Sequence, residues 1–209
     1  MSRYRRNTFL CFMLVLSAAA VTGCAQSTPG KEFFMIEASR PSGVVQTPSD
    51  ATLEVRLLNV DTAFASKNLV YRLGEFRYET DYYRQFLVTP GQMLMERTRR
   101  WVSDSGLFKQ VLPPSSQITP TYTLQGIVTA LYGDFTNESA PVAVMRIRFF
   151  LVKHGSDEGA VVFSQAYRVA QPLSAKTAEA LMDALSKDLT EILTRLEEDL
   201  RKYLAKPSS

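Results

Sequence analysis

Histidine occurs once in the 209 residues and cysteine only twice, so few side chains are available for metal binding or nucleophilic catalysis. A closed zinc site takes about four ligands, mostly Cys and His, which this composition does not provide. The motifs G-x-S-x-G and H-E-x-x-H are absent, and so is a phosphate-binding glycine loop. We therefore expect no enzyme activity, no metal site and no cofactor.

The single histidine, His154, lies in the turn-like stretch "KHGSDEG". A lone histidine at a turn is more often solvated than catalytic. Asp157 and Glu158 are adjacent in the chain, so in a strand their side chains point to opposite faces and cannot act together as an acid and a base. An enzyme remains the least favoured interpretation.

Long apolar runs are also missing. Beyond the N-terminal region no stretch of about 18 apolar residues occurs. The run from Phe9 to Ala20 follows Arg3, Arg5 and Arg6 and precedes the small residues Thr22 and Gly23. It is too short for a span of about 20 residues, and its order is that of a secretory signal peptide. We predict a signal peptide over residues 1–23.

Cys24 directly follows this segment, and Val21-Thr22-Gly23-Cys24 resembles the bacterial lipobox. The resemblance implies cleavage before Cys24, a diacylglyceryl group on its sulfur and usually an N-acyl chain. The alternatives are a chance cysteine after a signal peptide, or a free structural thiol. A disulfide is nearly excluded, because Cys11 leaves with the signal peptide and Cys24 then has no intramolecular partner. Ala25, where an inner-membrane retention signal typically has Asp, favours the periplasmic face of the outer membrane.

Net charge is low once the signal peptide is removed. Its loss takes away three arginines and no acid, which lowers the basic count from 24 to 21, equal to the 21 acidic residues. Nothing in this balance favours nucleic acid as a partner. The hydrophobic content of 45% excludes a largely disordered chain.

We predict a flexible tether over residues 24–32 and one domain over residues 33–205. Alternation of apolar and polar residues and turn-rich connections predict a series of strands. These comprise a short first strand at 33–36, a strand at 52–60, a hairpin at 68–80 joined near Gly74, and long strands at 121–132, 141–154 and 160–170.

Two helices are predicted, at about 90–105 and about 174–204. Thr89, Pro90 and Gln92 are typical of a helix start, and Gly106 suits its end. In the second helix an apolar stripe repeats every three or four residues from Ala178 to Leu200. The stripe fits a sheet that needs covering, which we favour, or a coiled-coil seam. The predicted fold class is α+β: a single mainly antiparallel sheet with both helices on one face.

Residues 71–86 are rich in aromatic and arginine side chains. They have too many rings for one face of a strand pair, so some must point away from the core. We hypothesise a partner-binding surface, because Tyr and Arg are common at interface hot spots; cross-strand packing is the alternative. The candidate residues are Tyr71, Arg72, Phe76, Arg77, Tyr78, Tyr82, Tyr83 and Arg84. The stretch "ERTRR" (96–100) fits a solvated helix face, or a contact with anionic lipid headgroups.

The ordered set of segments resembles the ABC-type transport auxiliary lipoprotein family. The resemblance rests on Val70-Tyr71-Arg72, the aromatic segment 76–86, Pro90, Trp101, "SGLFKQV" (105–111) and "YTLQGIVTALYGDF" (122–135). Where many members have Trp-x-x-Pro-Pro before the first helix, this chain has "QFLVTP" (85–90).

The resemblance implies a lipid-anchored, non-enzymatic accessory of an MCE-type ABC transporter, which moves phospholipids or other hydrophobic molecules between the inner and outer membranes. It implies an MCE-domain protein as partner, and a homo-oligomer is possible because some members form rings. The alternative is a structural outer-membrane lipoprotein that acts in envelope assembly through protein contacts.

Overall fold

The computed structural model describes residues 30–41, 49–155 and 159–206. The predicted signal peptide, Cys24 and most of the predicted tether lie outside these residues, as do Asp157 and Glu158. From Lys31 onward the described residues form one compact unit. None of the helices described combines the length and the hydropathy that a membrane span requires.

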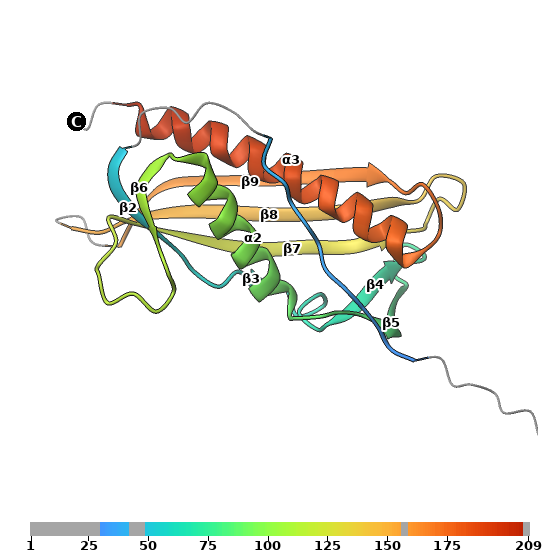
Figure 1. The fold of residues 1–209 in the computed structure, drawn as a ribbon. Coiled ribbons are helices and arrows are strands. Elements are labelled where there is room, and N and C mark those ends of the chain that lie inside the picture. The colour runs from blue at the N-terminus through green and yellow to red at the C-terminus, as the bar shows by residue number, and fades with distance from the viewer. Residues whose placement is uncertain (1–29, 42–48, 156–158, 207–209) are drawn as a thin grey trace, which may run out of the picture. The chain divides into compact units, whose positions relative to one another are not determined.

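The described residues contain nine strands and two helices (Figure 1). In chain order these are β1 (Glu32–Phe34), β2 (Ser49–Val55), β3 (Asn59–Val60), β4 (Asn68–Arg72), β5 (Tyr78–Phe86), α2 (Pro90–Ser105), β6 (Phe108–Leu112), β7 (Tyr122–Asp134), β8 (Val142–Lys153), β9 (Ala160–Pro172) and α3 (Ala178–Leu204). The predicted strand at 52–60 is thus two strands, and β6 was not anticipated.

β7 organises the sheet. One of its edges pairs antiparallel with β8 over its whole length, and β8 pairs antiparallel with β9. The other edge is shared by three short parallel strands, β2, β3 and β4, placed one after another along β7. β6 pairs with β2, β5 with β4, and β1 with β5. The longest pairings are antiparallel, which confirms the predicted fold class.

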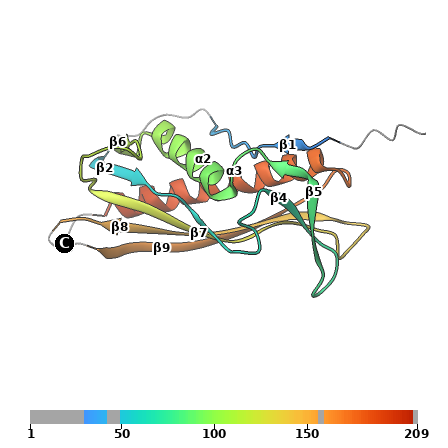
Figure 2. The same cartoon turned by 90° about the horizontal axis from the view of Figure 1, so that it is seen from below.

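Both helices cover the same face of this sheet (Figure 2). α2 follows Thr89 with Pro90 in its first turn, and ends at Gly106, whose φ of 65° is left-handed and suits glycine. α3 begins at Ala178 rather than near Ser174, because the Thr177 hydroxyl accepts the Ala180 N–H at 3.2 Å and caps the helix there.

The apolar stripe of α3 packs on β8 and β9. Leu189, Ile192 and Leu196 are fully buried, and on the sheet Met145, Ile147 and Phe149 are fully buried too. Sheet covering therefore accounts for the stripe, and no coiled-coil seam is needed to explain it.

Residues 35–41, which we call the strap, run between α2 and α3 (Figure 1). Ile36 is fully buried, its N–H lies 3.2 Å from the Met93 sulfur, and the Glu37 N–H donates to the Ser186 hydroxyl at 3.1 Å. One strap thereby ties both helices together.

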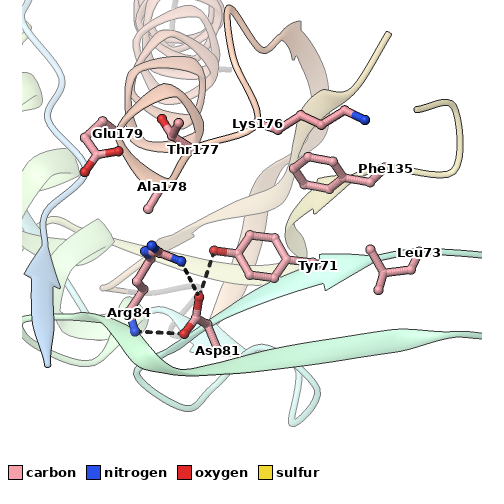
Figure 3. A pocket seen from close by; sticks show the side chains of 9 residues that line it. All are labelled: Tyr71, Leu73, Asp81, Arg84, Phe135, Lys176, Thr177, Ala178 and Glu179. Atoms are coloured by element: carbon pink, nitrogen blue, oxygen red, sulfur yellow. Dashed lines mark hydrogen bonds and ion pairs between the residues drawn. The ribbon is translucent and has the colours of Figure 1, made fainter. Parts of the chain in front are cut away.

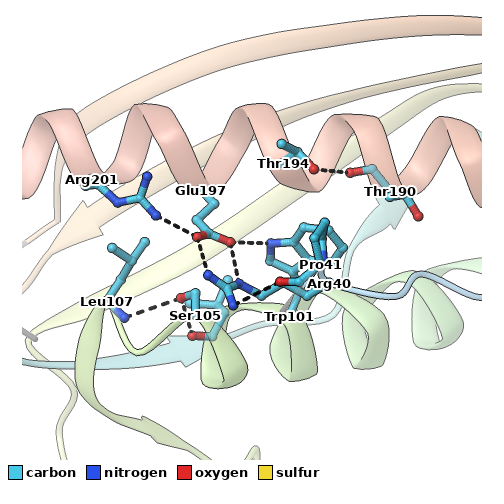
Figure 4. Close-up of polar contacts among 10 residues, drawn as sticks. Arg40, Pro41, Trp101, Ser105, Leu107, Thr190, Thr194, Glu197 and Arg201 are labelled. Atoms are coloured by element: carbon cyan, nitrogen blue, oxygen red, sulfur yellow. Dashed lines mark hydrogen bonds and ion pairs between the residues drawn. The ribbon is translucent and has the colours of Figure 1, made fainter. Parts of the chain in front are cut away.

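The strap ends in a buried ionic cluster around Glu197 (Figure 4). Arg40 donates two hydrogen bonds to the Glu197 carboxylate, at 2.8 and 2.9 Å. The Trp101 indole N–H donates at 2.9 Å and Arg201 at 2.7 Å. Burial alone raises the pKa of Glu197, but these donors and their charges outweigh it and hold the pKa below its usual value. Glu197 therefore joins α2, α3 and the strap as a carboxylate.

Arg97 departs from the expectation for "ERTRR". Its side chain is buried, donates to the Ile36 carbonyl at 3.0 Å and pairs with Glu37. Arg99 pairs with Glu96 within the helix. The stretch is therefore not a uniformly solvated face, because Arg97 lies one turn from Met93 and one turn from Trp101, on the side that faces the strap.

Candidate functional site

The predicted aromatic–arginine segment forms a hairpin at one end of the sheet. β4 and β5 are antiparallel, with Tyr71 opposite Glu79 and Arg72 opposite Tyr78. β4 lies beside the C-terminal end of β7, and β5 carries β1 on its other edge. Figure 2 shows the loop that joins β4 to β5 on the side of the sheet away from the helices.

Asp81 breaks the regular alternation of β5. Its Oδ1 accepts the backbone N–H groups of Tyr83 and Arg84, at 2.9 and 3.0 Å. The pairing register between β4 and β5 shifts over the same stretch, which is the mark of a β-bulge. As a result the neighbouring rings Tyr82 and Tyr83 both stay on the surface, with exposed fractions of 64% and 40%.

Most of the exposed large apolar side chains of the described residues lie on this hairpin or beside it. We call this set the aromatic hairpin surface; its members are Phe33, Phe76, Tyr78, Tyr82, Tyr83 and Leu87. Phe76 is 88% exposed at the hairpin loop. Tyr82 packs edge-on against Tyr83, and the Lys31 ammonium lies 4.6 Å from its ring centroid. The expectation that some rings point away from the core is confirmed.

Two of the candidate residues instead line a pocket between the hairpin and the first turn of α3 (Figure 3). Tyr71 donates to Asp81 Oδ2 at 3.3 Å, and Arg84 approaches the same oxygen at 3.5 Å. Burial, and then the Asp81 charge, raise the pKa of Tyr71 to about 12, so it stays a donor. The pocket encloses about 360 Å³, and Phe135, Lys176 and Glu179 are also among its lining residues.

This pocket is built more like a support than a ligand site. Both carboxylate oxygens of Asp81 already accept hydrogen bonds inside the protein. Hydrogen bonds from the Glu179 backbone N–H and from the Thr177 side chain lower the pKa of the Glu179 carboxyl. The cavity is therefore lined by charges of both signs, carboxylates as well as Arg84 and Lys176. The hydrogen bonds tie Asp81 and Arg84 of β5 to Tyr71 of β4 and to Glu32 of β1, and so hold the strand that carries the exposed tyrosines.

Arg72 and Tyr78 point to the other side of the sheet. Tyr78 meets Tyr132 edge-on at 5.8 Å between ring centroids, and Tyr132 stacks on Phe64 at 5.6 Å. Arg72 pairs with Asp134 at 3.3 Å and lies 6.0 Å from the Tyr78 ring centroid. The eight predicted residues thus share one hairpin but divide between two faces, while Phe76 and Arg77 sit at its loop.

Sequence reasoning missed the contributions of α3 and of the N-terminal segment. Lys176, Thr177 and Glu179 reach the pocket from a helix start that the apolar pattern placed too early. Glu32 joins the site because β1 lies beside β5, and its carboxylate accepts from Arg84 Nε at 3.1 Å. A polar group at a helix cap was the available signal for Thr177; nothing local marks the pairing of Glu32.

His154 lies outside this site. It is half-buried, and its Nε2 lies 2.8 Å from the hydroxyl of the fully buried Thr123. In the ranges 30–41, 49–155 and 159–206, no group of three His, Cys, Asp or Glu side chains is placed to hold a metal ion.

Comparisons with known proteins identify a family and structures of similar fold. A family model described as ABC-type transport auxiliary lipoprotein component matches residues 34–197. Among solved structures, protein XCC0632 from Xanthomonas campestris is similar with a TM-score of 0.69 at 21% identity, over 79% of this chain and 92% of that one. An uncharacterized protein is similar with a TM-score of 0.61 at 12% identity, over 80% and 99% of the two chains. No curated protein sequence matches. These two likenesses show the fold, and the family match over most of the chain shows that it belongs to the ABC-type transport auxiliary lipoprotein components.

Proposed function

We propose that this protein is a lipid-anchored periplasmic accessory of an MCE-type ABC transporter, which carries phospholipids or other hydrophobic molecules between the inner and outer membranes. Membership of the auxiliary lipoprotein family supports a role beside a transporter. The site that we propose is the exposed pair Tyr82 and Tyr83 of the aromatic hairpin surface, which the Asp81 bulge presents to an MCE-domain protein.

The anchor is Cys24, acylated on the periplasmic face of the outer membrane. The Val-Thr-Gly-Cys sequence behind an apolar segment supports this assignment. Seven residues separate Cys24 from Glu32, and at most ~3.6 Å per residue they span about 25 Å. The domain is therefore held close to the bilayer. The tether leads into β1, which pairs with β5, the strand that carries Tyr82 and Tyr83.

Docking centres on Tyr82 and Tyr83. Large aromatic side chains that become buried at an interface are typical hot spots, each worth about 2 kcal/mol or more on truncation. Both rings are held outward by the Asp81 bulge, so little conformational entropy is lost when a partner covers them.

The test is retention of the MCE-domain partner by affinity-purified protein with Tyr82→Ala and Tyr83→Ala together. We expect normal circular dichroism and at least a 30-fold loss of affinity, which corresponds to about 2 kcal/mol. The matched control is Leu57→Ala with Ile118→Ala, two side chains exposed by 56% and 61% away from the hairpin; it should retain the partner.

Unchanged partner binding by the tyrosine variant rejects docking at the hairpin, and loss of folding shows that the rings belong to the core. A separate arm tests the anchor. Cys24→Ala should move the protein from the membrane fraction to the soluble periplasm. If the variant still sediments with membranes after a salt wash, Cys24 is not the anchor.

A further inference from the structure

The face of β7, β8 and β9 that points away from the helices (Figure 2) carries three exposed arginines, while at its other end Phe64 and Tyr78 cover Tyr132. Arg146 and Arg148 alternate on β8 with the buried residues Ile147 and Phe149, so they point outward. Arg168 of β9 pairs directly with Arg146, and Arg148 lies between Ile127 and Ala166. We call this surface the outer sheet face.

The three arginines have no acidic partner in the part of the chain that the structure describes. Most other arginines there do form ion pairs, among them Arg40, Arg72 and Arg84. Like charges directly opposite each other on neighbouring strands destabilise a sheet, and the pair Arg146–Arg168 is such a case. The sheet therefore carries a like-charge pair that a bound external anion would relieve.

The neighbouring side chains on this face are neutral, some of them polar, such as Thr129 and Ser164, and others apolar. Ile127 is 40% exposed beside Arg148, and Val161 is 58% exposed on β9. Two carboxylates at the ends of the face are engaged: Glu54 pairs with Arg56 and Asp134 with Arg72. A sheet face bearing guanidinium groups among exposed apolar side chains matches the interface of an anionic bilayer, where phosphates accept from arginine.

The hairpin loop adds a second, independent observation. It lies on the same side of the sheet as the outer sheet face (Figure 2), and it carries Phe76, the most exposed large apolar side chain of those described, next to Arg77. An aromatic ring flanked by a cation is the combination that settles at a membrane–water interface.

We propose that the outer sheet face and the hairpin loop form a membrane-facing surface that binds anionic lipid headgroups, with α2 and α3 turned away from the bilayer. The proposal rests on the proposed lipid anchor only for its setting. β1 is an edge strand that pairs with β5, so the tether joins the domain at the hairpin end of the sheet. Attachment also raises the local lipid concentration, which makes weak contacts effective.

The test uses the mature chain from residue 24 with Cys24→Ala, so that acylation plays no part. Its partition onto vesicles of phosphatidylglycerol and phosphatidylcholine is compared with partition onto phosphatidylcholine alone. Each arginine near an anionic surface contributes about fivefold to partition. The variant Arg146→Gln, Arg148→Gln, Arg168→Gln should therefore bind the anionic vesicles on the order of 100-fold more weakly.

The matched control removes three cations from the exposed side of α3, with Lys187→Gln, Arg195→Gln and Lys202→Gln. Its net charge equals that of the arginine variant, so it should keep the partition of the parent within about threefold if position decides. Raising the salt from roughly 0.05 M to 0.5 M should release the parent chain. This last measurement needs no variant and holds even if one of them misfolds.

Equal partition of the parent chain onto both kinds of vesicle, or salt-independent partition, overturns the proposal. So does equal weakening by the arginine and control variants, which would report net charge alone. If the arginine variant keeps its vesicle partition but loses the MCE-domain protein, the outer sheet face is a protein contact instead. Failure of partner docking through Tyr82 and Tyr83 leaves this result untouched, so the two proposals fail separately.

Discussion

Replacement of Asp188 by Asn should change the free energy of unfolding relative to the parent protein, and this difference should become more favourable to the variant as the pH rises from acidic to neutral. Asp188 lies in the apolar stripe of α3, is fully buried, and neither of its oxygens makes a close, well-aligned hydrogen bond among the described residues, although the Gln171 backbone lies nearby. Its pKa is raised from 3.8 to about 7, mainly by burial and next by the charge of the nearby Glu191. The Gln171 backbone and the Arg168 charge offset this only in part.

The magnitude follows from linkage between protonation and folding. Between pH 3.8 and about 7 the unfolded chain has released a proton that the folded chain still holds, so stability falls as pH rises through this window. Above it both states are ionised and the penalty is constant. A shift of about three units at ~1.4 kcal/mol each gives at most about 4 kcal/mol. Asn cannot ionise, but its amide N–H groups lack partners, which lowers the stability of the variant by ~1–3 kcal/mol at every pH.

The assay is urea unfolding of the mature Cys24→Ala chain at about pH 4.5, 6 and 8, followed by the fluorescence of Trp101, the only tryptophan. The free energy of unfolding of the Asn variant minus that of the parent should rise by ~2–4 kcal/mol from the lowest to the highest pH. Asp183→Asn, on an exposed side chain of the same helix, should change it by a few tenths of a kcal/mol. A pH-independent difference for Asp188→Asn would show that the buried carboxyl is not the group that titrates.

Two further substitutions test the packing of the helices. Gly91→Ala should destabilise the fold by ~1–3 kcal/mol, because its Cβ would lie 2.5 Å from the Leu58 carbonyl oxygen. The control Gly74→Ala should be nearly neutral, because its Cβ would lie 3.7 Å from the nearest atom, in Arg77. Equal urea midpoints for the two variants would refute the close approach at Gly91. Arg40→Ala should lower the free energy of unfolding by ~3 kcal/mol, because it leaves the buried Glu197 without its bidentate partner. Lys187→Ala, which breaks an exposed ion pair, should lower it by less than ~0.5 kcal/mol. Thermal melting measures both variants, and similar melting temperatures would contradict this prediction.

The parts of the fold that could be predicted are those encoded by local periodicity. The stripe of α3 and the alternation of β8 depend on neighbours a few residues away, so the sequence displays them directly. The parallel pairing of β2, β3 and β4 along β7 depends on segments far apart in the chain, and no local signal marks it. The aromatic hairpin was found because its ring count exceeds what one strand face can bury.

The helical periodicity also marks three charged residues as buried, which the sequence analysis did not predict. Arg97 falls on the same helix face as Met93 and Trp101, and Asp188 and Glu197 occupy positions of the α3 stripe. A charged residue at an apolar position predicts a buried partner or, for an acid, a raised pKa. The sequence could show that these charges are buried, but not that Arg40 from the strap meets Glu197 while Asp188 meets no partner.

The parallel pairing of β1 with β5 has a mechanical consequence. Tension on the tether enters the fold at Lys31 and is borne first by the β1–β5 hydrogen bonds, which are loaded in shear because the two strands run alongside each other. Ile36, Arg97 and the Arg40–Glu197 pair follow in series. β5 is also the strand of Tyr82 and Tyr83, so under the proposed function a pull between the lipid anchor and a partner at these tyrosines would pass through the β1–β5 strand pair before it reached the helices.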